Sequence, residues 1–146
     1  MTANLLINGP VTRDMISSIL AFFGNDPASG GHSVFLGQVR ADVKGSKQVV
    51  AIDYSAYEDM VRKEAEKITQ SIFSEFNDVR SVKIMHSTGR VNAGEISLFV
   101  LVSSGHRHQA MEACSKTVEL IKSNLPIWKK EIFSDNTHEW QKDSLA

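Results

Sequence analysis

The 146-residue chain has a single cysteine, Cys114, and only three prolines. One cysteine excludes an internal disulfide, and its apolar helical context predicts a core residue in a reducing compartment. No run of about eighteen apolar residues occurs, and the stretch from Met1 to Pro10 has no basic segment leading into an apolar one. We therefore expect neither a membrane span nor a secretory leader, and a cytoplasmic location.

The chain also lacks an excess of either charge. Sixteen Lys and Arg against seventeen Asp and Glu give a net charge of -1, so no global basic field draws it to nucleic acid or to a membrane surface. The five histidines show none of the spacings typical of a zinc site, and no metal or other cofactor is expected. Without a Gly-rich phosphate loop or a Gly-x-Ser-x-Gly turn, ATP use and serine hydrolysis lose support.

The length and a hydrophobic content of 42% fit one domain over residues 1–146. Apolar residues at helical spacing predict three helices: one after a Thr12 cap, one over Tyr57–Phe76 and one over His106–Asn124. β-rich runs predict strands over Ala3–Ile7, Ser33–Val39, Val49–Tyr54, Val79–His86 and Glu95–Ser103, and a last strand after Pro126. This order mixes hairpins with helical crossovers, which indicates an α+β fold with an antiparallel or mixed sheet.

Two of the predicted strand arrangements are specific enough to test. Ser33–Val39 and Val49–Tyr54 flank a polar loop over residues 41–47, so we expect them to pair as a hairpin. Glu95–Ser103 is apolar on both of its alternating faces. Such a strand is covered on both sides, and we expect it to be central or to pack against a partner subunit.

Two strand ends carry cationic residues that can bind anions. Gly37-Gln38-Val39 leads into Arg40, whose guanidinium can hold a phosphate or carboxylate bidentately. Ser104-Gly105-His106-Arg107 leads from a strand into a helix, whose N-terminal N–H groups favour anions. The alternatives are a solvated Arg40, and a simple Ser104 helix cap with His106 and Arg107 in solvent.

A third cationic segment surrounds Pro126. Lys122 falls at the C-terminal end of the last helix, where the helix dipole favours a cation anyway, and Lys129, Lys130 and Glu131 follow the proline. If the chain folds back at Pro126, Lys122 and Lys129 meet. Each lysine then depresses the pKa of the other toward a range useful for an acid or a nucleophile. Together with Arg40, His106 and Arg107 this segment predicts one anion site.

Several segments carry a resemblance when taken in order. They are Phe35-Leu36-Gly37-Gln38-Val39-Arg40, Asp53 to Met60, His86 with Gly89, Gly94-Glu95, Ser104 to Arg107, Lys122 to Glu131 and the later Trp140. With this order and spacing, the chain resembles the large, catalytic subunit of molybdopterin synthase over nearly its whole length.

The resemblance implies an α/β hammerhead-type subunit that forms a homodimer, with a small ubiquitin-like sulfur carrier at each end to make a heterotetramer. The carrier's C-terminal Gly-Gly thiocarboxylate would donate sulfur to cyclic pyranopterin monophosphate, and two transfers would form the dithiolene of molybdopterin. The chain would then be a sulfurtransferase that uses no ATP.

The resemblance also assigns roles to the cationic residues. Lys122 and Lys129 match the family's catalytic lysines, which would stabilise the carrier's tail and the tetrahedral oxyanion and move protons. Substrate binding would involve Gln38, Val39, Arg40, His106, Arg107, Lys122, Lys129, Lys130 and Glu131. Within this set, Arg40, His106 and Arg107 would hold the pterin phosphate.

Two other functions remain open from the sequence. One is a non-catalytic module that binds the carrier's tail in the same basic pocket, and the pairing of Lys122 with Lys129 favours the enzyme over it. The other is a small-molecule phosphate-binding enzyme that turns over without any carrier.

Overall fold

The structure, a computed structural model, describes residues 5–142. Its helices are α1 (Arg13–Phe23), α2 (Glu58–Glu75) and α3 (Arg107–Asn124). Its strands are β1 (Leu6–Asn8), β2 (Gly31–Gln38), β3 (Val43–Lys44), β4 (Lys47–Ala56), β5 (Val79–Asn92), β6 (Ile96–Ser104), β7 (Ile127–Phe133) and β8 (His138–Lys142). They form one mostly antiparallel sheet in the order β2-β6-β5-β4-β7-β8, with β1 beside β5 and β3 beside β4. The predicted α+β class is therefore confirmed.

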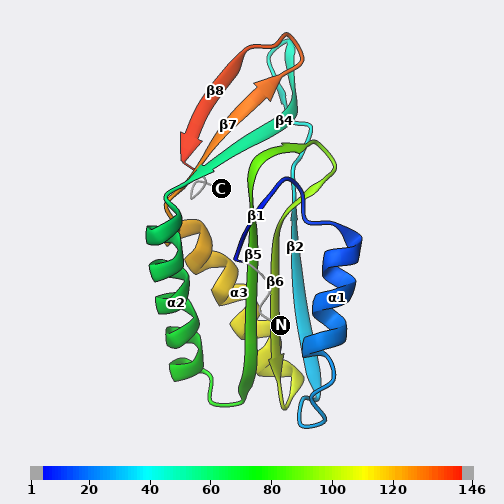
Figure 1. Cartoon of the computed structure of the whole chain (residues 1–146), viewed down its shortest axis with the longest axis vertical. Coiled ribbons are helices and arrows are strands. Elements are labelled where there is room, and N and C mark those ends of the chain that lie inside the picture. The colour runs from blue at the N-terminus through cyan, green and yellow to red at the C-terminus, as the bar shows by residue number, and fades with distance from the viewer. Residues whose placement is uncertain (1–4, 143–146) are drawn as a thin grey trace.

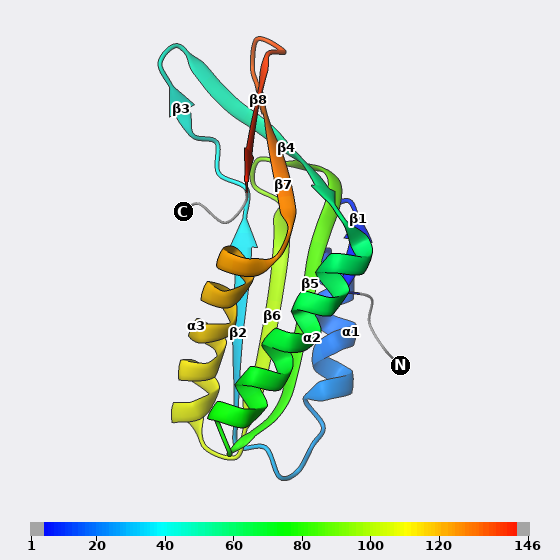
Figure 2. The ribbon, with the colours of Figure 1, turned by 90° about the vertical axis from the view of Figure 1, so that its left-hand side faces the viewer.

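The molecule is elongated, with a helix-covered body and an extension made of strands alone. Figures 1 and 2 show β2, β5 and β6 in the body, with α2 and α3 on one face of the sheet and α1 on the other. β3, β4, β7 and β8 rise above the helices. β5 joins the two parts, because it pairs with β6 up to His86 and with β4 from Gly89 onward.

The helices follow from the sequence patterns that predicted them. Thr12 caps α1, because its Oγ1 accepts a hydrogen bond of 3.2 Å from the Met15 N–H. One face of α2 is buried at helical spacing, through Val61, Ala65, Ile68 and Ile72. The apolar face, rather than helix propensity alone, therefore sets how α2 lies on the sheet.

β6 is central and is covered on both sides within one chain. Leu98, Val100 and Val102 belong to the core under α2 and α3, whereas Phe99 and Leu101 belong to the smaller core under α1. The prediction of a central strand is confirmed. Because the chain's own helices supply the cover, this strand gives no reason to expect a partner subunit.

The predicted hairpin between the second and third strands is wrong. β2 pairs with β6 along its whole length, and β4 pairs instead with β5, β7 and the short β3. The expected polar loop contains β3, because Gly45 adopts a φ of 66° and allows a tight turn between Lys44 and Lys47. β3 therefore pairs with β4 where the prediction had placed β2, and β2 lies at the edge of the sheet instead.

Two predicted strand boundaries differ from the structure, and one strand was not predicted. β5 continues through Gly89, whose φ of 74° lets the strand change partners, whereas the prediction ended it at His86. β8 was not predicted, because His138–Lys142 is short and mixes charged with aromatic residues. The first strand begins at Leu6 among the described residues, and the expected strand residues 3–4 lie outside them.

Candidate functional site

Lys122 and Lys129 lie on either side of the turn from α3 to β7. α3 ends at Asn124, and the N–H of the next residue, Leu125, still donates to the Ile121 carbonyl at 3.1 Å. Leu125 itself is extended, as a residue before a proline is expected to be, and Pro126 cannot continue the helix. The strand that starts directly afterwards carries Lys129, and both lysines are half-buried. The chain does not fold back at Pro126, because β7 continues in the direction in which α3 runs (Figures 1 and 2).

Lys129 and Glu131 share the buried face of β7, because strand residues two apart point the same way. Lys129 lies opposite Tyr54 of β4, and the Tyr54 hydroxyl donates to the Ser97 Oγ at 3.0 Å. The Glu131 side chain is only 6% exposed and accepts a hydrogen bond of 2.5 Å from the Lys44 Nζ. The Gln141 amide donates to the same carboxylate.

Lys44 is a residue near this site that the sequence analysis did not select. Its hydrogen bond to Glu131 raises the pKa of Lys44 above the ordinary lysine value, and the charges of Glu139 and Asp42 act in the same direction. The signal that could have found it is Gly45-Ser46, a two-residue turn that places Lys44 directly opposite Lys47.

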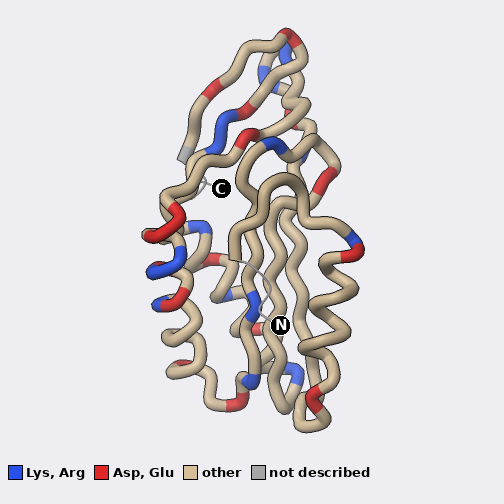
Figure 3. Tube along the Cα trace, viewed as in Figure 1, with Lys and Arg blue, Asp and Glu red and all other residues tan. Residues whose placement is uncertain are grey.

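Lys130 lies on the opposite face of β7 from Lys129 and Glu131. Its Nζ is 3.8 Å from the Asp53 carboxylate and 5.3 Å from the centre of the Trp140 ring. Beside it, a cavity of about 440 Å³ is lined by Ser55, Ala56, Tyr57, Trp128 and Trp140. Figure 3 shows basic and acidic positions next to each other along β4 and β7, so the positive charge is local rather than a continuous surface.

Gln38, Val39 and Arg40 lie where β2 leaves the sheet. Val39 is buried, and its N–H donates to the Glu95 carbonyl at 3.0 Å. This anchor directs Arg40 outward, where its side chain is 82% exposed and lies 3.4 Å from an Asp42 carboxylate oxygen. An exposed ion pair of this kind is weak, so a phosphate can compete for the guanidinium.

His106 and Arg107 lie at the other end of α3 from Lys122. His106 is the N-cap residue and Arg107 begins the helix, while Lys122 is in its last turn. An 18-residue helix is about 27 Å long, at 1.5 Å per residue. One chain therefore separates its cationic residues into two groups, and the single anion site expected from the sequence does not form within it.

Two further residues lie in the protein interior. Cys114 is buried in the core as expected, and burial raises the pKa of its thiol. His86 is 1% exposed, with its Nδ1 2.8 Å from the Ser87 carbonyl oxygen. Within residues 5–142, no three His, Cys, Asp or Glu side chains are grouped to hold a metal ion, and no helix is long and apolar enough to cross a membrane.

Comparison with known sequences gives consistent matches. A family model described as "MoaE protein" matches residues 11–124. A molybdopterin synthase catalytic subunit of Dictyostelium discoideum is 42% identical over 119 residues, which cover 80% of this chain and 75% of that protein. One of Drosophila melanogaster is 37% identical over 139 residues, which cover 94% of this chain but only 36% of that protein.

Solved structures with the same fold match over nearly the full length. Molybdopterin synthase from Staphylococcus aureus is 30% identical with a TM-score of 0.84, covering 97% of this chain and 98% of that one. A chain from a complex of subunits 1 and 2 of molybdopterin-converting factor from Helicobacter pylori is 23% identical with a TM-score of 0.78, covering 94% and 88%. The second likeness is evidence of fold alone.

Proposed function

Because the chain belongs to the MoaE protein family and acts as a sulfurtransferase in molybdenum cofactor biosynthesis, we propose that it takes sulfur from the C-terminal thiocarboxylate of a small ubiquitin-like carrier. The acceptor is cyclic pyranopterin monophosphate, and two transfers complete the dithiolene. The observation that carries this proposal is the position of Lys122 and Lys129, two half-buried lysines on consecutive elements around Pro126.

Cations at this turn suit the chemistry, because the carrier's tail and the substrate's phosphate are both anions that repel each other. Once the thiocarboxylate sulfur has bonded to the substrate, water attacks the acyl carbon, and an ammonium group beside the terminal glycine carbonyl stabilises the oxyanion that forms. The acyl–sulfur bond then breaks, which leaves the sulfur on the substrate and a carboxylate on the carrier. The two lysines also hold and deliver protons during this step. The neighbouring Glu131 is already paired with Lys44, so its charge is balanced within the site.

The second group of cations, His106 and Arg107, joins the site if two copies pair along β2. Within residues 5–142 the outer edge of β2 pairs with no other strand, and Val34, Phe35 and Leu36 on it are 41%, 37% and 43% exposed. An unpaired apolar edge of this length is a site for strand addition. We therefore include a homodimer in the proposal, with one carrier bound to each copy.

The direction of β2 explains why such a pair would complete the site. β2 starts at Gly31, where an added Cβ would lie 3.0 Å from the Arg107 Cα, and ends at Gln38, two residues before Arg40. In a two-fold antiparallel pair, the start of one β2 lies beside the end of the other. His106 and Arg107 of one copy then approach Arg40 of its partner, at the end of the body where α3 also ends (Figure 2).

The test is reconstitution of the purified chain with a thiocarboxylated carrier and cyclic pyranopterin monophosphate, followed by oxidation to the fluorescent pterin derivative. We expect product only when both partners are present. The Lys122→Ala chain should lose product, and Lys116→Ala is its matched control. Lys116 is also on α3, but it pairs with Glu75 at 2.6 Å on the surface. Carrier binding without product in the wild-type chain would instead favour a tail-binding module, and turnover without carrier would favour an independent enzyme.

A further inference from the structure

Two loops meet at the end of the molecule that carries His106. One is the turn between α2 and β5, with Asp78, and the other is the turn between β6 and α3, with Gly105. The Gly105 N–H donates to the Asp78 carbonyl at 3.1 Å, and the Asp78 N–H donates to the Gln109 Oε1 at 2.9 Å. A Cβ on Gly105 would lie 2.5 Å from the Asp78 Oδ1, so the carboxyl group fits directly against the glycine.

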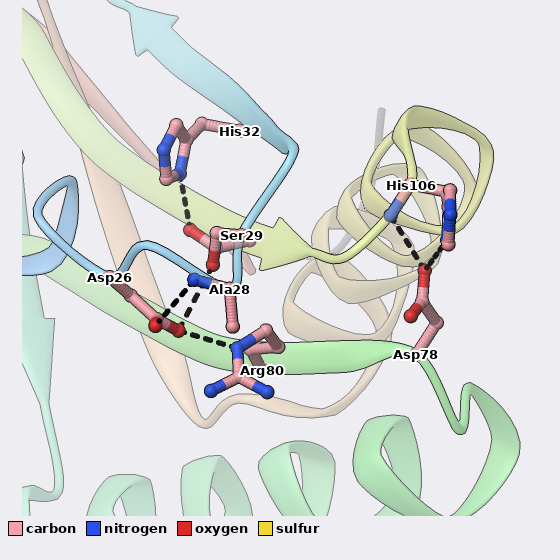
Figure 4. Close-up of polar contacts among 8 residues, drawn as sticks. Asp26, Ala28, Ser29, His32, Asp78, Arg80 and His106 are labelled. Carbon is pink, nitrogen blue, oxygen red and sulfur yellow. Dashed lines mark hydrogen bonds and ion pairs between the residues drawn. The ribbon is translucent and has the colours of Figure 1, made fainter.

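The same carboxyl group also holds His106. Its Oδ2 accepts the His106 backbone N–H at 2.7 Å and lies 3.1 Å from the ring Nδ1 (Figure 4). The Asp78 side chain is 29% exposed, whereas the His106 side chain is 88% exposed. One end of the imidazole is therefore attached to the protein, and the rest of the ring faces outward.

A carboxylate only accepts hydrogen bonds, so the ring nitrogen that faces it must carry the proton. Nδ1 then keeps its proton in both the neutral and the charged ring, and Nε2 is the atom left for a ligand. The charged ring donates from Nε2, while the neutral ring offers a lone pair there. Because Asp78 accepts from both the backbone and the ring of His106, the ring has little freedom to turn.

We propose that Asp78 is a positioning residue, which fixes the orientation and tautomer of His106 so that Nε2 points toward the substrate's phosphate. This inference rests on the proposed function, which places His106 at that phosphate. Asp78 does not touch the substrate and acts only through the ring. It therefore affects how well the phosphate is held, rather than the sulfur transfer itself.

The first measurement is the tautomer of His106, read from long-range ¹H–¹⁵N NMR spectra at a pH where the ring is neutral. We expect the Nδ1–H tautomer in the wild-type chain and its loss in Asp78→Ala. This variant keeps the hydrogen bond from the Gly105 N–H to the carbonyl of residue 78, but it removes the acceptor of the His106 backbone N–H and of the His106 ring. Asp78→Asn retains an acceptor without the charge and should be intermediate. Asp26→Asn is the control, because Asp26 pairs at 2.5 Å with Arg80, near the same end of the molecule, and does not contact His106.

The second measurement is steady-state kinetics with the carrier present. Asp78→Ala should raise the KM for cyclic pyranopterin monophosphate about tenfold, as expected for one misaligned charge-assisted hydrogen bond, with kcat nearly unchanged. The same tautomer in wild-type and Asp78→Ala chains would overturn the inference, and so would a changed tautomer with an unchanged KM. If His106→Ala itself leaves KM unchanged, the phosphate assignment in the proposed function fails instead, and the NMR result still decides whether Asp78 orients the ring.

Discussion

The contact between Lys44 and Glu131 connects the β3–β4 hairpin to the strand that carries Lys129. Glu131 is almost completely buried and accepts from two side chains, those of Lys44 and Gln141. Its replacement by alanine removes both hydrogen bonds to a charged acceptor. We expect this substitution to loosen the extension of the molecule more than any change at an exposed ion pair.

The magnitude follows from the number and burial of these contacts. A hydrogen bond to a charged group contributes about 1.5–3 kcal/mol, and the lower value applies because Lys44 is 41% exposed. Two such bonds give a loss of roughly 3 kcal/mol for Glu131→Ala, which corresponds to a fall in Tm of roughly 6–12 °C for a chain of this size. Glu131→Gln keeps an acceptor oxygen and should cost only about 1 kcal/mol.

The assay is thermal and urea-induced unfolding followed by circular dichroism, with a matched pair of lysine substitutions. Lys44 and Lys47 are both 41% exposed, but the carboxylate partner of Lys47, Asp135, is 48% exposed, compared with 6% for Glu131. Lys44→Met should therefore destabilise the fold by about 2 kcal/mol and Lys47→Met by less than about 1 kcal/mol. Equal losses for the two variants would refute the reasoning, because burial of the partner would then not govern the energy.

Four further predictions test the site and its surroundings. Lys122→Ala and Lys129→Ala should each reduce product formation by at least roughly 10²-fold with an unchanged circular dichroism spectrum, and a wild-type rate in either variant would remove that lysine from the mechanism. Sedimentation without carrier should give about twice 16.2 kDa, whereas a strict monomer at micromolar concentration would contradict the homodimer. Arg40→Lys and Arg107→Lys should raise the KM for cyclic pyranopterin monophosphate and leave carrier affinity in calorimetry nearly unchanged; a collapse of carrier affinity with normal substrate binding would assign the arginines to the tail. The hydrogen bond from Arg80 holds the pKa of Asp26 below its ordinary value, so the wild-type chain should be more stable than Asp26→Asn at neutral pH, where the carboxyl group is charged. That advantage should disappear as the pH falls through the lowered pKa, and urea midpoints whose difference is the same at neutral and acid pH would show that the ion pair is not the cause.

Local patterns predicted the helices and the end of α3 before Pro126, because their causes lie within a few residues of sequence. Thr12 caps the next turn of the chain, and Pro126 blocks the helix at its own position. The strand partners were harder to predict. The composition of Val49–Tyr54 does not distinguish β2 from β7 as a pairing partner. Only the three-dimensional packing selects β7.

The candidate site was also predicted only in part from the sequence. Residue types and spacing identified Lys122, Lys129 and the two cationic strand ends, and they identified the family to which these belong. Lys44 was missed because its contact with Glu131 joins positions 87 residues apart.

By itself, the sequence determined the α+β class, the three helices and the cationic residues available for the reaction, since these depend on periodicity and side-chain chemistry. Only the tertiary structure decided that β2 lies at the edge of the sheet formed by residues 5–142, that Lys130 faces away from Lys129, and that α3 holds His106 far from Lys122. The physical reason is that strand pairing and helix length set distances between residues that are remote in sequence or on opposite faces of one element.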